Sequence, residues 1–210
     1  VVWEEKIKFY PIFCPPLSSN TYVVANDDGR ALVIDAACKT EDLQKIATSK
    51  KLKIEAMLMT HGHFDHAALG SKLKEAGIPT YIHKNDADKL TSFKNMAVFM
   101  GYHFNKFSAD HLISDGDVLE LAGFKIEVIF TPGHSEGGVC YRIENCLFTG
   151  DTIFNMGYGR TDFMDGSFSA LKESAKKIFA IPENLTVYPG HGKSSTLDFE
   201  RANNPINFDD

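Results

Sequence analysis

Short apolar runs alternate with polar turns along most of the chain, a pattern that is typical of β-strands. Asn26-Asp27-Asp28-Gly29 separates two such runs and predicts the turn of a hairpin. Ala122-Gly123 and Glu144-Asn145 predict the turns of two more hairpins. The expected strands are Ile7–Phe13, Tyr22–Ala25, Ala31–Ile34, Ile54–Met59, Thr80–Ile82, Val118–Leu121, Phe124–Phe130, Val139–Ile143, Cys146–Thr149 and Thr186–Tyr188.

Longer stretches with apolar residues on one face predict helices between these strands. Thr40 is the expected N-cap of the first helix, and Gly77 is expected to end the second. Strands followed by helices occur in both halves of the chain, which predicts an α/β fold with two sheets face to face and helices outside. The expected helices are Thr40–Lys50, Ala67–Ala76, Ser167–Phe179 and one beginning at each of Asn85 and Thr196.

Residues 92–107 are less regular and combine several aromatic residues with Met96 and Met100. Aromatic residues at helical spacing usually belong to a core, so a helix packed on the domain is the favoured interpretation. Two alternatives stay open: the segment covers a functional site, or it forms the contact of a homodimer.

The composition favours one globular domain. A chain of 210 residues with 43% hydrophobic content can bury a sizeable core, so we expect a single domain spanning residues 1–210. The net charge is −6, from 22 basic and 28 acidic residues, and no basic tract attracts nucleic acid or anionic lipid. No apolar run approaches the roughly 20 residues of a membrane helix, and residues 1–8 lack the apolar core of a signal peptide.

Cysteine usage points to a reducing compartment. The four cysteines form no CxxC pair and no zinc-knuckle spacing. We therefore expect reduced, buried thiols in a cytoplasmic protein. They are Cys14, Cys38, Cys140 and Cys146.

The segment Thr60-His61-Gly62-His63-Phe64-Asp65-His66 follows an apolar strand and concentrates histidine with aspartate. Strand ends are where α/β folds place ligands, and Gly62 lets the backbone turn so that both neighbouring imidazoles can face one point. Three histidines and one carboxylate exceed what a single tetrahedral ion takes from one loop. The segment therefore predicts two adjacent metal ions.

Three further candidates, His134, Asp151 and His191, each follow a predicted strand directly and have glycine beside them. Each residue alone would more often be structural than a ligand. Together with residues 61–66, they predict ligands gathered from four strand ends.

The order and types of these residues resemble the metallo-β-lactamase superfamily, and within it the glyoxalase II (hydroxyacylglutathione hydrolase) group. The resemblance extends from Asn20 to Pro205, and the C-terminal residues resemble the short bacterial-type members. The motifs that carry it are Asp35, His61-Gly62-His63-Phe64-Asp65-His66, Thr131-Pro132-Gly133-His134, Thr149-Gly150-Asp151, Gly159-Arg160-Thr161-Asp162-Phe163 and Pro189-Gly190-His191-Gly192.

The resemblance implies a four-layer αββα sandwich with two metal sites along one edge of the sheets. Zinc is the expected metal because it is redox-inert and common at such sites, while iron and manganese also suit these ligands. The implied ligands are His61, His63 and His134 for the first ion, Asp65, His66 and His191 for the second, and Asp151 as the bridge.

The implied activity is hydrolysis of a small-molecule thioester such as S-lactoylglutathione. Two nearby metal ions can share a hydroxide that attacks the carbonyl carbon. Asp65 is the candidate catalytic residue, because it could orient that hydroxide and accept its proton. We expect the chain to lack the C-terminal helical domain that holds glutathione in longer enzymes, so no glutathione-binding residue is assigned.

The main alternative is an oxidoreductase that resembles the persulfide dioxygenases, which share the HxHxDH run but use one iron. The intact Pro189-Gly190-His191-Gly192 favours two metals and the hydrolase. A β-lactamase is disfavoured by Asp151, and a nuclease by the negative charge. A further alternative is a non-catalytic metal-binding protein of the same fold, against which the complete ligand set argues.

Five other polar residues have lesser expected roles. Arg160 and Asp162 are weak candidates for substrate binding and could instead pair with each other. Asp35 is expected to accept hydrogen bonds from the metal loop. His83 is expected to be an ordinary surface or capping residue, and His103 could line a pocket.

Overall fold

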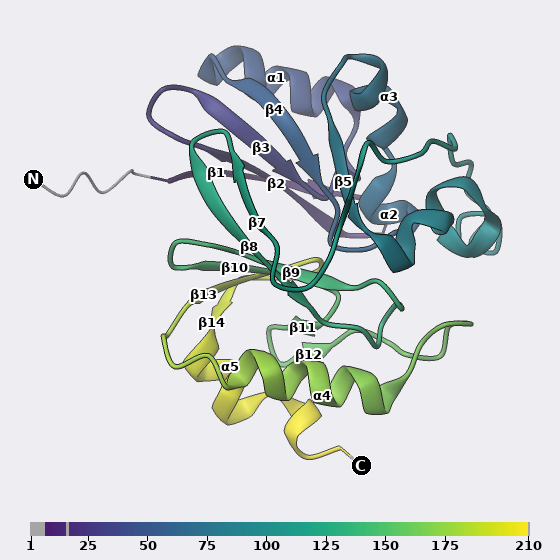
Figure 1. The fold of residues 1–210 in the computed structure, drawn as a ribbon, viewed down its shortest axis with the longest axis vertical. Coiled ribbons are helices and arrows are strands. Elements are labelled where there is room, and N and C mark those ends of the chain that lie inside the picture. The colour runs from purple at the N-terminus through teal and green to yellow at the C-terminus, as the bar shows by residue number, and fades with distance from the viewer. Residues whose placement is uncertain (1–6, 16, 210) are drawn as a thin grey trace, which may run out of the picture.

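The computed structural model describes residues 7–15 and 17–209, and its first half forms a six-stranded sheet in the order β1-β2-β3-β4-β5-β6 (Figure 1). The turn at residues 26–29 joins β2 and β3 as the expected antiparallel hairpin. The strands from β3 to β6 run parallel to one another. The strands are β1 Lys8–Cys14, β2 Ser19–Ala25, β3 Arg30–Ile34, β4 Lys53–Leu58, β5 Thr80–His83 and β6 His111–Ile113.

The second half forms another six-stranded sheet, in the order β14-β13-β10-β9-β8-β7. The two predicted hairpins, β7–β8 and β9–β10, are confirmed, and β13 runs parallel to β10. A separate ribbon consists of β11 Ile153–Phe154 and β12 Gly157–Tyr158. The strands of the large sheet are β7 Val118–Leu121, β8 Phe124–Phe130, β9 Val139–Ile143, β10 Cys146–Gly150, β13 Thr186–Pro189 and β14 Ser195–Thr196.

Helices cover the outer faces of both sheets. In Figure 1, α1 and α3 lie on the first sheet, and α4 and α5 lie on the second. The expected αββα sandwich is therefore confirmed. The helices are α1 Thr40–Lys50, α2 Phe64–Ala67, α3 Gly70–Glu75, α4 Phe168–Phe179 and α5 Leu197–Asn203, with the 3-10 helices η1 Lys84–Thr91, η2 Phe93–Asn95 and η3 Pro205–Asn207.

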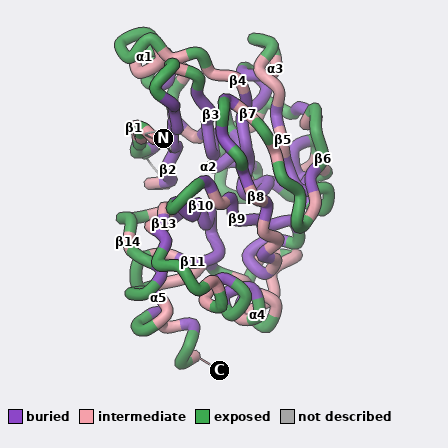
Figure 2. The backbone as a smooth tube through the Cα atoms, turned by 60° about the vertical axis from the view of Figure 1, so that its left-hand side comes forward, coloured by how far each residue is buried: buried purple, intermediate pink, exposed green. Residues whose placement is uncertain are grey.

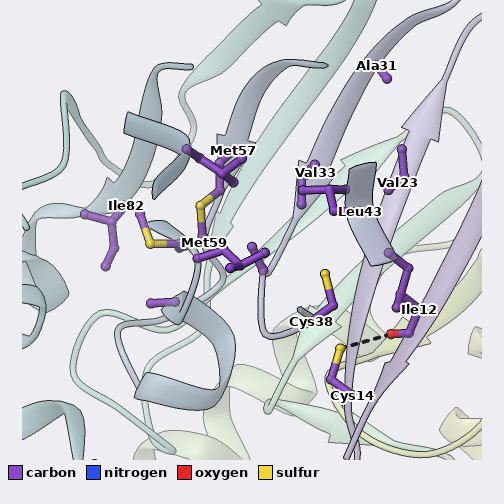
Figure 3. Close-up of a cluster of buried hydrophobic side chains, with 14 of the residues drawn as sticks. Ile12, Cys14, Val23, Ala31, Val33, Cys38, Leu43, Met57, Met59 and Ile82 are labelled. Carbon is purple, nitrogen blue, oxygen red and sulfur yellow. Dashed lines mark hydrogen bonds between the residues drawn. The ribbon is translucent and has the colours of Figure 1, made fainter. Parts of the chain in front are cut away.

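Alternating side chains of the strands separate these layers. On β2, Tyr22 and Val24 pack in the cluster between the two sheets, whereas Val23 packs with Leu43 of α1 on the outer side. Figure 3 shows part of that outer cluster, and Figure 2 shows the buried strands of both sheets. Burial of each large apolar side chain contributes about 1.5–3 kcal/mol, so the alternation determines which face of each strand points inward.

The two sheets are joined directly where β4 ends. Tyr141 of β9 is buried and donates a hydrogen bond from its hydroxyl to the Met59 carbonyl oxygen, with 2.7 Å between the oxygens. The Val139 N–H donates to the Thr60 carbonyl oxygen at 2.9 Å. These bonds place the second sheet against the residues that immediately precede His61.

The predicted helix over 67–76 is confirmed only over 70–75, where α3 forms and ends before Gly77, because a break separates α3 from the short helix α2. At the break, the Leu69 N–H donates to the Ala36 carbonyl oxygen at 2.9 Å, and the Ala36 N–H donates to the His66 carbonyl oxygen at 2.7 Å. Pairing with the loop after β3 thus replaces continuous helical bonding. Thr40 is also not the N-cap of α1, because Lys39 occupies that position without a side-chain hydrogen bond.

A helix packed on the domain is wrong for residues 92–107. The helix expected from Asn85 is the 3-10 helix η1, and beyond η2 the chain continues in turns and extended backbone. Met96 and Gly101 adopt left-handed φ values of 71° and 77°, which interrupt a continuous α-helix. Phe93 and Phe99 remain 55% and 61% exposed.

All four cysteines are free and buried, as expected. Of the helices in residues 7–15 and 17–209, none combines the length and the hydropathy that a membrane crossing requires.

Removal of the Tyr141 hydroxyl should weaken the connection between the sheets. In Tyr141→Phe the buried Met59 carbonyl oxygen loses its partner on β9, so we expect the free energy of unfolding to fall by about 1–2 kcal/mol. Urea denaturation measures this change. Tyr188→Phe is the control, because no hydrogen bond of the Tyr188 hydroxyl is found among the described residues, and an equal loss in both variants would contradict the expectation.

Candidate metal centre

The histidine-rich segment crosses the end of the first sheet and enters α2. His63 is the N-cap of α2, and Asp65 and His66 lie within its four residues. The ligand candidates therefore lie partly on a helix, which begins at Phe64 and not at Ala67 as predicted. Gly62 is required here, because a Cβ atom would lie 2.7 Å from Cβ of Lys89.

The other three candidates lie at the ends of β8, β10 and β13, where they were predicted. His134 follows β8, Asp151 follows β10, and His191 follows β13. At Gly190, a Cβ atom would lie 2.2 Å from Asp151 Oδ1 and 2.7 Å from His66 Cε1. Glycine at this position therefore lets β13 bring its loop against the carboxylate.

The structure brings all seven predicted side chains into one cluster, in three overlapping groups whose donor atoms lie within 4.8 Å of one another. Each group contains three side chains from at least two segments of the chain. Such groups could hold metal ions. They are His61 with His63 and His134, His61 with His66 and Asp151, and Asp65 with His66 and His191.

In the first group, His63 Nδ1 and His134 Nε2 lie 2.9 Å apart. The His61 ring centroid lies 4.7 Å from that of His63 and 4.8 Å from that of His134. The three imidazoles thus surround one position.

The third group, Asp65 with His66 and His191, also lies against Asp151. His66 Nε2 lies 3.3 Å from His191 Nε2, and Asp65 Oδ2 lies 3.4 Å from the same His191 atom. Asp151 Oδ2 lies 3.4 Å from His134 Nε2 and 3.5 Å from His191 Nε2, while its Oδ1 lies 3.4 Å from His66 Nε2. One carboxylate therefore contacts both groups.

Hydrogen bonds behind the rings determine which nitrogens face inward. Asp35 Oδ2 accepts from His66 Nδ1 at 2.9 Å, and the Arg160 carbonyl oxygen accepts from His134 Nδ1 at 2.8 Å. The Thr60 hydroxyl donates its hydrogen to Asp35 Oδ2 at 2.7 Å. Thr60 Oγ1 can therefore only accept from His61 Nδ1, which lies 3.1 Å away. In the neutral form of His61, His66 and His134, the Nε2 atom therefore carries the lone pair that faces the cluster, and Asp35 has the expected supporting role.

The electrostatics of the cluster also suit a cation. Burial lowers the pKa of His61 and His63 well below the ordinary value, so both rings stay neutral. Burial alone would also lower the pKa of His66, but the nearby carboxylates, Asp151 foremost, raise it to about 10. The carboxylates thus favour positive charge at this position.

The donor set fits divalent metal ions. His61 Nε2 and Asp151 Oδ1 are buried and have no hydrogen-bond partner among the described residues. Such groups are costly to bury unless something coordinates or bonds them. Imidazole and carboxylate donors without thiolate suit zinc, iron and manganese.

A buried ion-pair network holds the metal-site loops in register. Asp86 is fully buried and accepts from the Gly62 N–H at 2.7 Å and from the Gly137 N–H at 2.6 Å. Lys89, 1% exposed, donates to Asp86 at 2.8 Å and to Asp165 at 2.5 Å. Burial would lower the pKa of Lys89, but the two aspartates raise it above its ordinary value, so the ammonium stays charged.

The loop that carries His191 is held from the first sheet. The Asn20 side-chain amide donates to the Pro189 and Gly192 carbonyl oxygens at 3.0 and 2.9 Å. The Tyr22 hydroxyl donates to the Pro189 carbonyl oxygen at 2.7 Å. The His191 loop is thus anchored to both sheets.

A cavity of about 400 Å³ opens above the cluster. Five of the seven candidate ligands line its floor, and its walls are mainly apolar. The wall residues are Leu17, Phe64, Met96, Met100, Phe154, Tyr158, Arg160 and Phe163.

The weaker candidates lie at the cavity, on the protein surface and in the interior. Arg160 lines the cavity and pairs with Asp162 at 2.6 Å, and its guanidinium lies 4.7 Å from the Phe163 ring centroid. His103 is exposed and bonds Asn105, so it does not line the cavity. His83 accepts from the Asn85 N–H, as expected for a cap, but it is buried against Phe130 and is not a surface residue.

Sequence reasoning missed the Asp86–Lys89–Asp165 network and most of the cavity wall. The i, i+3 spacing of Asp86 and Lys89 is common on exposed helices, so it gives no signal of burial. Phe154 and Tyr158 lie in the two-residue strands β11 and β12, and Phe163 lies in a loop, so none of them belongs to a segment long enough to show a period. Met96 and Met100 were noted as a cover for the site, and they do line its cavity.

Comparison of the sequence with known proteins agrees with this site. The profile of the family described as "Metallo-beta-lactamase superfamily" matches residues 14–191. The chain is 33% identical to "Probable metallo-hydrolase YqgX" of Bacillus subtilis, over 91% of this chain and 93% of that protein. It is 30% identical to "Hydroxyacylglutathione hydrolase GloC" of Haemophilus influenzae, over 89% and 92%.

Solved structures with the same fold include a metal-bound relative. The B3 metallo-β-lactamase BLEG-1 is 33% identical with a TM-score of 0.90, over 95% of this chain and 99% of that chain. TTHA1623 in a di-iron-bound form is 31% identical with a TM-score of 0.84, over 94% and 99%. ETHE1 from Myxococcus xanthus is 26% identical with a TM-score of 0.79, over 94% and 83%.

Neutralising Asp86 should destabilise the loops around the cluster. Asp86→Asn removes one partner of a buried ion pair and sets an amide N–H₂ against a backbone N–H, so we expect the free energy of unfolding to fall by about 3 kcal/mol. Chemical denaturation of the metal-free protein measures it. Asp88 lies in η1 with Asp86 and forms an exposed ion pair with Lys94. Asp88→Asn should therefore leave the denaturation midpoint unchanged. Equal midpoints for the two variants would contradict the role of the network.

Proposed function

Because the chain belongs to the metallo-β-lactamase superfamily, we propose that it is a metal-dependent hydrolase that binds two divalent ions and cleaves thioesters. The observation that carries the proposal is the position of Asp151, whose carboxylate contacts both groups of histidines. A site for one ion would not need a carboxylate between two sets of ligands.

The proposed ligand assignment follows the three overlapping groups. His61, His63 and His134 would hold the first ion. Asp65, His66 and His191 would hold the second, and Asp151 would contact both. Zinc is the proposed metal for its redox inertness, and the di-iron form of TTHA1623 supports iron as the alternative.

When bound, two such ions supply Lewis acidity, lowering the pKa of water and polarising a carbonyl oxygen. The protein residues orient the reactants around them. Burial would raise the pKa of Asp65, but His66 and His191 lower it well below its ordinary value, so the group is a carboxylate at neutral pH. We assign to Asp65 the orientation of the attacking water and acceptance of its proton.

The cavity walls would exclude bulk water from the reacting carbonyl group. The Phe163 ring lies 5.0 Å from the His63 ring and 5.4 Å from the His134 ring, and Phe154 lies 5.9 Å from the His191 ring. Electrostatic interactions with a developing oxyanion are stronger where water is excluded.

Thioesters are the proposed substrate class, with S-lactoylglutathione as the first compound to test. The relative named hydroxyacylglutathione hydrolase supports this class. The four free, buried cysteines support a reducing compartment, for which we propose the cytoplasm.

Loss of the shared carboxylate should dismantle the two-ion site. Asp151→Ala should bind at most one ion per chain and lose more activity than the roughly 10–100-fold that removal of an outer partner costs. Elemental analysis and hydrolysis rates measure both. Asp27→Ala, in the β2–β3 turn, serves as the control, and full metal content in Asp151→Ala would refute the assignment.

The function itself is tested with a panel of thioesters, matched oxygen esters and a β-lactam on protein of measured metal content. We expect two ions per chain, thioesters as the best substrates, activity lost on chelation and activity restored by divalent metal. One iron per chain with oxygen consumption on glutathione persulfide would instead support the oxidoreductase. Two ions per chain without hydrolysis of any compound would support a non-catalytic protein.

A further inference from the structure

The cavity beside the cluster has the chemistry of an acyl-chain site. Resting on the proposed thioester hydrolysis, we infer that the substrate carries an apolar acyl chain, and that Met96 is a specificity-determining residue for it. The cavity holds about 400 Å³, far more than a lactoyl group needs, and it begins directly at the candidate ligands.

The charges around the cavity disfavour glutathione as the group that fills it. Apart from the candidate ligands, Arg160 is the one charged residue among those found lining the cavity. Its guanidinium pairs with Asp162 and lies over Phe163, so it is already engaged. Along this wall, the two carboxylates and the ammonium of glutathione would thus meet only a guanidinium that is already paired, whereas a hydrocarbon chain needs no polar partner. We therefore place the acyl chain inside and the thiol carrier toward solvent.

Met96 occupies a strained backbone position at the cavity wall. Its φ of 71° is left-handed, a conformation that glycine or asparagine adopts at less cost. Asn95 holds this turn with hydrogen bonds to the Ser92 carbonyl oxygen at 2.9 Å and from the Ala97 N–H at 3.0 Å. Strain that the neighbouring bonds maintain, at a side chain facing the cavity, is a recurrent sign of function.

The apolar surface continues from Met96 toward the solvent. Met100 lines the same cavity, and Tyr102 stacks on Phe64 with 5.0 Å between ring centroids. In the same segment, Val98 and Phe99 are 72% and 61% exposed. A chain longer than the cavity could therefore extend along this segment. Methionine suits such a wall because its flexible side chain adapts to chains of different length.

The chain offers a matched pair of substitutions. Met96→Gly removes the side chain and also relieves the left-handed strain, so a loss of selectivity would not reflect a loss of stability. Met156 has a similar φ of 58°, is 53% exposed and is absent from the cavity wall, which makes Met156→Gly the control. Met96→Asn is a second variant that tolerates the same backbone and makes the wall polar.

The experiment measures kcat/KM for acetyl, butyryl, hexanoyl and octanoyl thioesters, each on N-acetylcysteamine and on glutathione. In the unaltered protein, kcat/KM should rise by up to roughly 4-fold per methylene, and the change of carrier should matter less than the acyl chain. Met96→Gly and Met96→Asn should lose about 10-fold on the octanoyl compound and less than about 2-fold on the acetyl compound. Met156→Gly should match the unaltered protein. Calorimetric titration with non-hydrolysable amide analogues should give the same order of affinities.

Two kinds of result overturn the inference. A flat or falling series, or a preference for S-lactoylglutathione, would refute the acyl-chain site while leaving thioester hydrolysis intact. Equal effects of Met96→Gly and Met156→Gly would refute the role of Met96. Absence of hydrolysis across the whole panel would overturn the proposed function and this inference together.

Discussion

The site depends on the way the chain is held where β4 ends. The Thr60 N–H and hydroxyl both donate to Asp35, which follows β3, at 2.8 and 2.7 Å. From the opposite side, β9 donates to the Met59 and Thr60 carbonyl oxygens. The residues just before His61 are thus fixed by both sheets. Because Asp35 also accepts from His66, one buried carboxylate orients the strand end and a candidate ligand together.

This anchoring carries an energetic cost that a metal would remove. The cluster buries His61 Nε2 and Asp151 Oδ1 without a hydrogen-bond partner among the described residues, and it places the carboxylates of Asp65 and Asp151 close together among imidazoles. Uncompensated polar groups of this kind destabilise a fold by a few kcal/mol each. Metal binding would convert that cost into stability, since ions that bind the folded state alone shift the folding equilibrium. The network of Asp86, Lys89 and Asp165 keeps the loops in place independently of any ion.

The sequence predicted those parts of the structure that local chemistry determines. The hairpin turns, the strand ends and the role of Asp35 follow from turn residues, apolar runs and the positions of polar residues after strands. The break between α2 and α3 was missed, because it arises from hydrogen bonds between Leu69, Ala36 and His66 that join distant segments. The three-residue strand β6 is too short to show a period. Burial of Lys89 was equally hidden, because its partner Asp165 lies 76 positions away in the sequence.

The same distinction separates the chemistry of this protein from its substrate. The candidate ligands stand at strand ends and on α2, where the sandwich determines their geometry, so a family resemblance can be carried to each of them. Most of the cavity wall comes from the 92–102 segment, the β11–β12 ribbon and the loop around Phe163, which lie outside the two large sheets and in no long helix. Relatives can share the ligands while differing in the wall, which is why one fold serves many substrates. The identity of the substrate must therefore be argued from residues such as Met96, which lies outside both sheets.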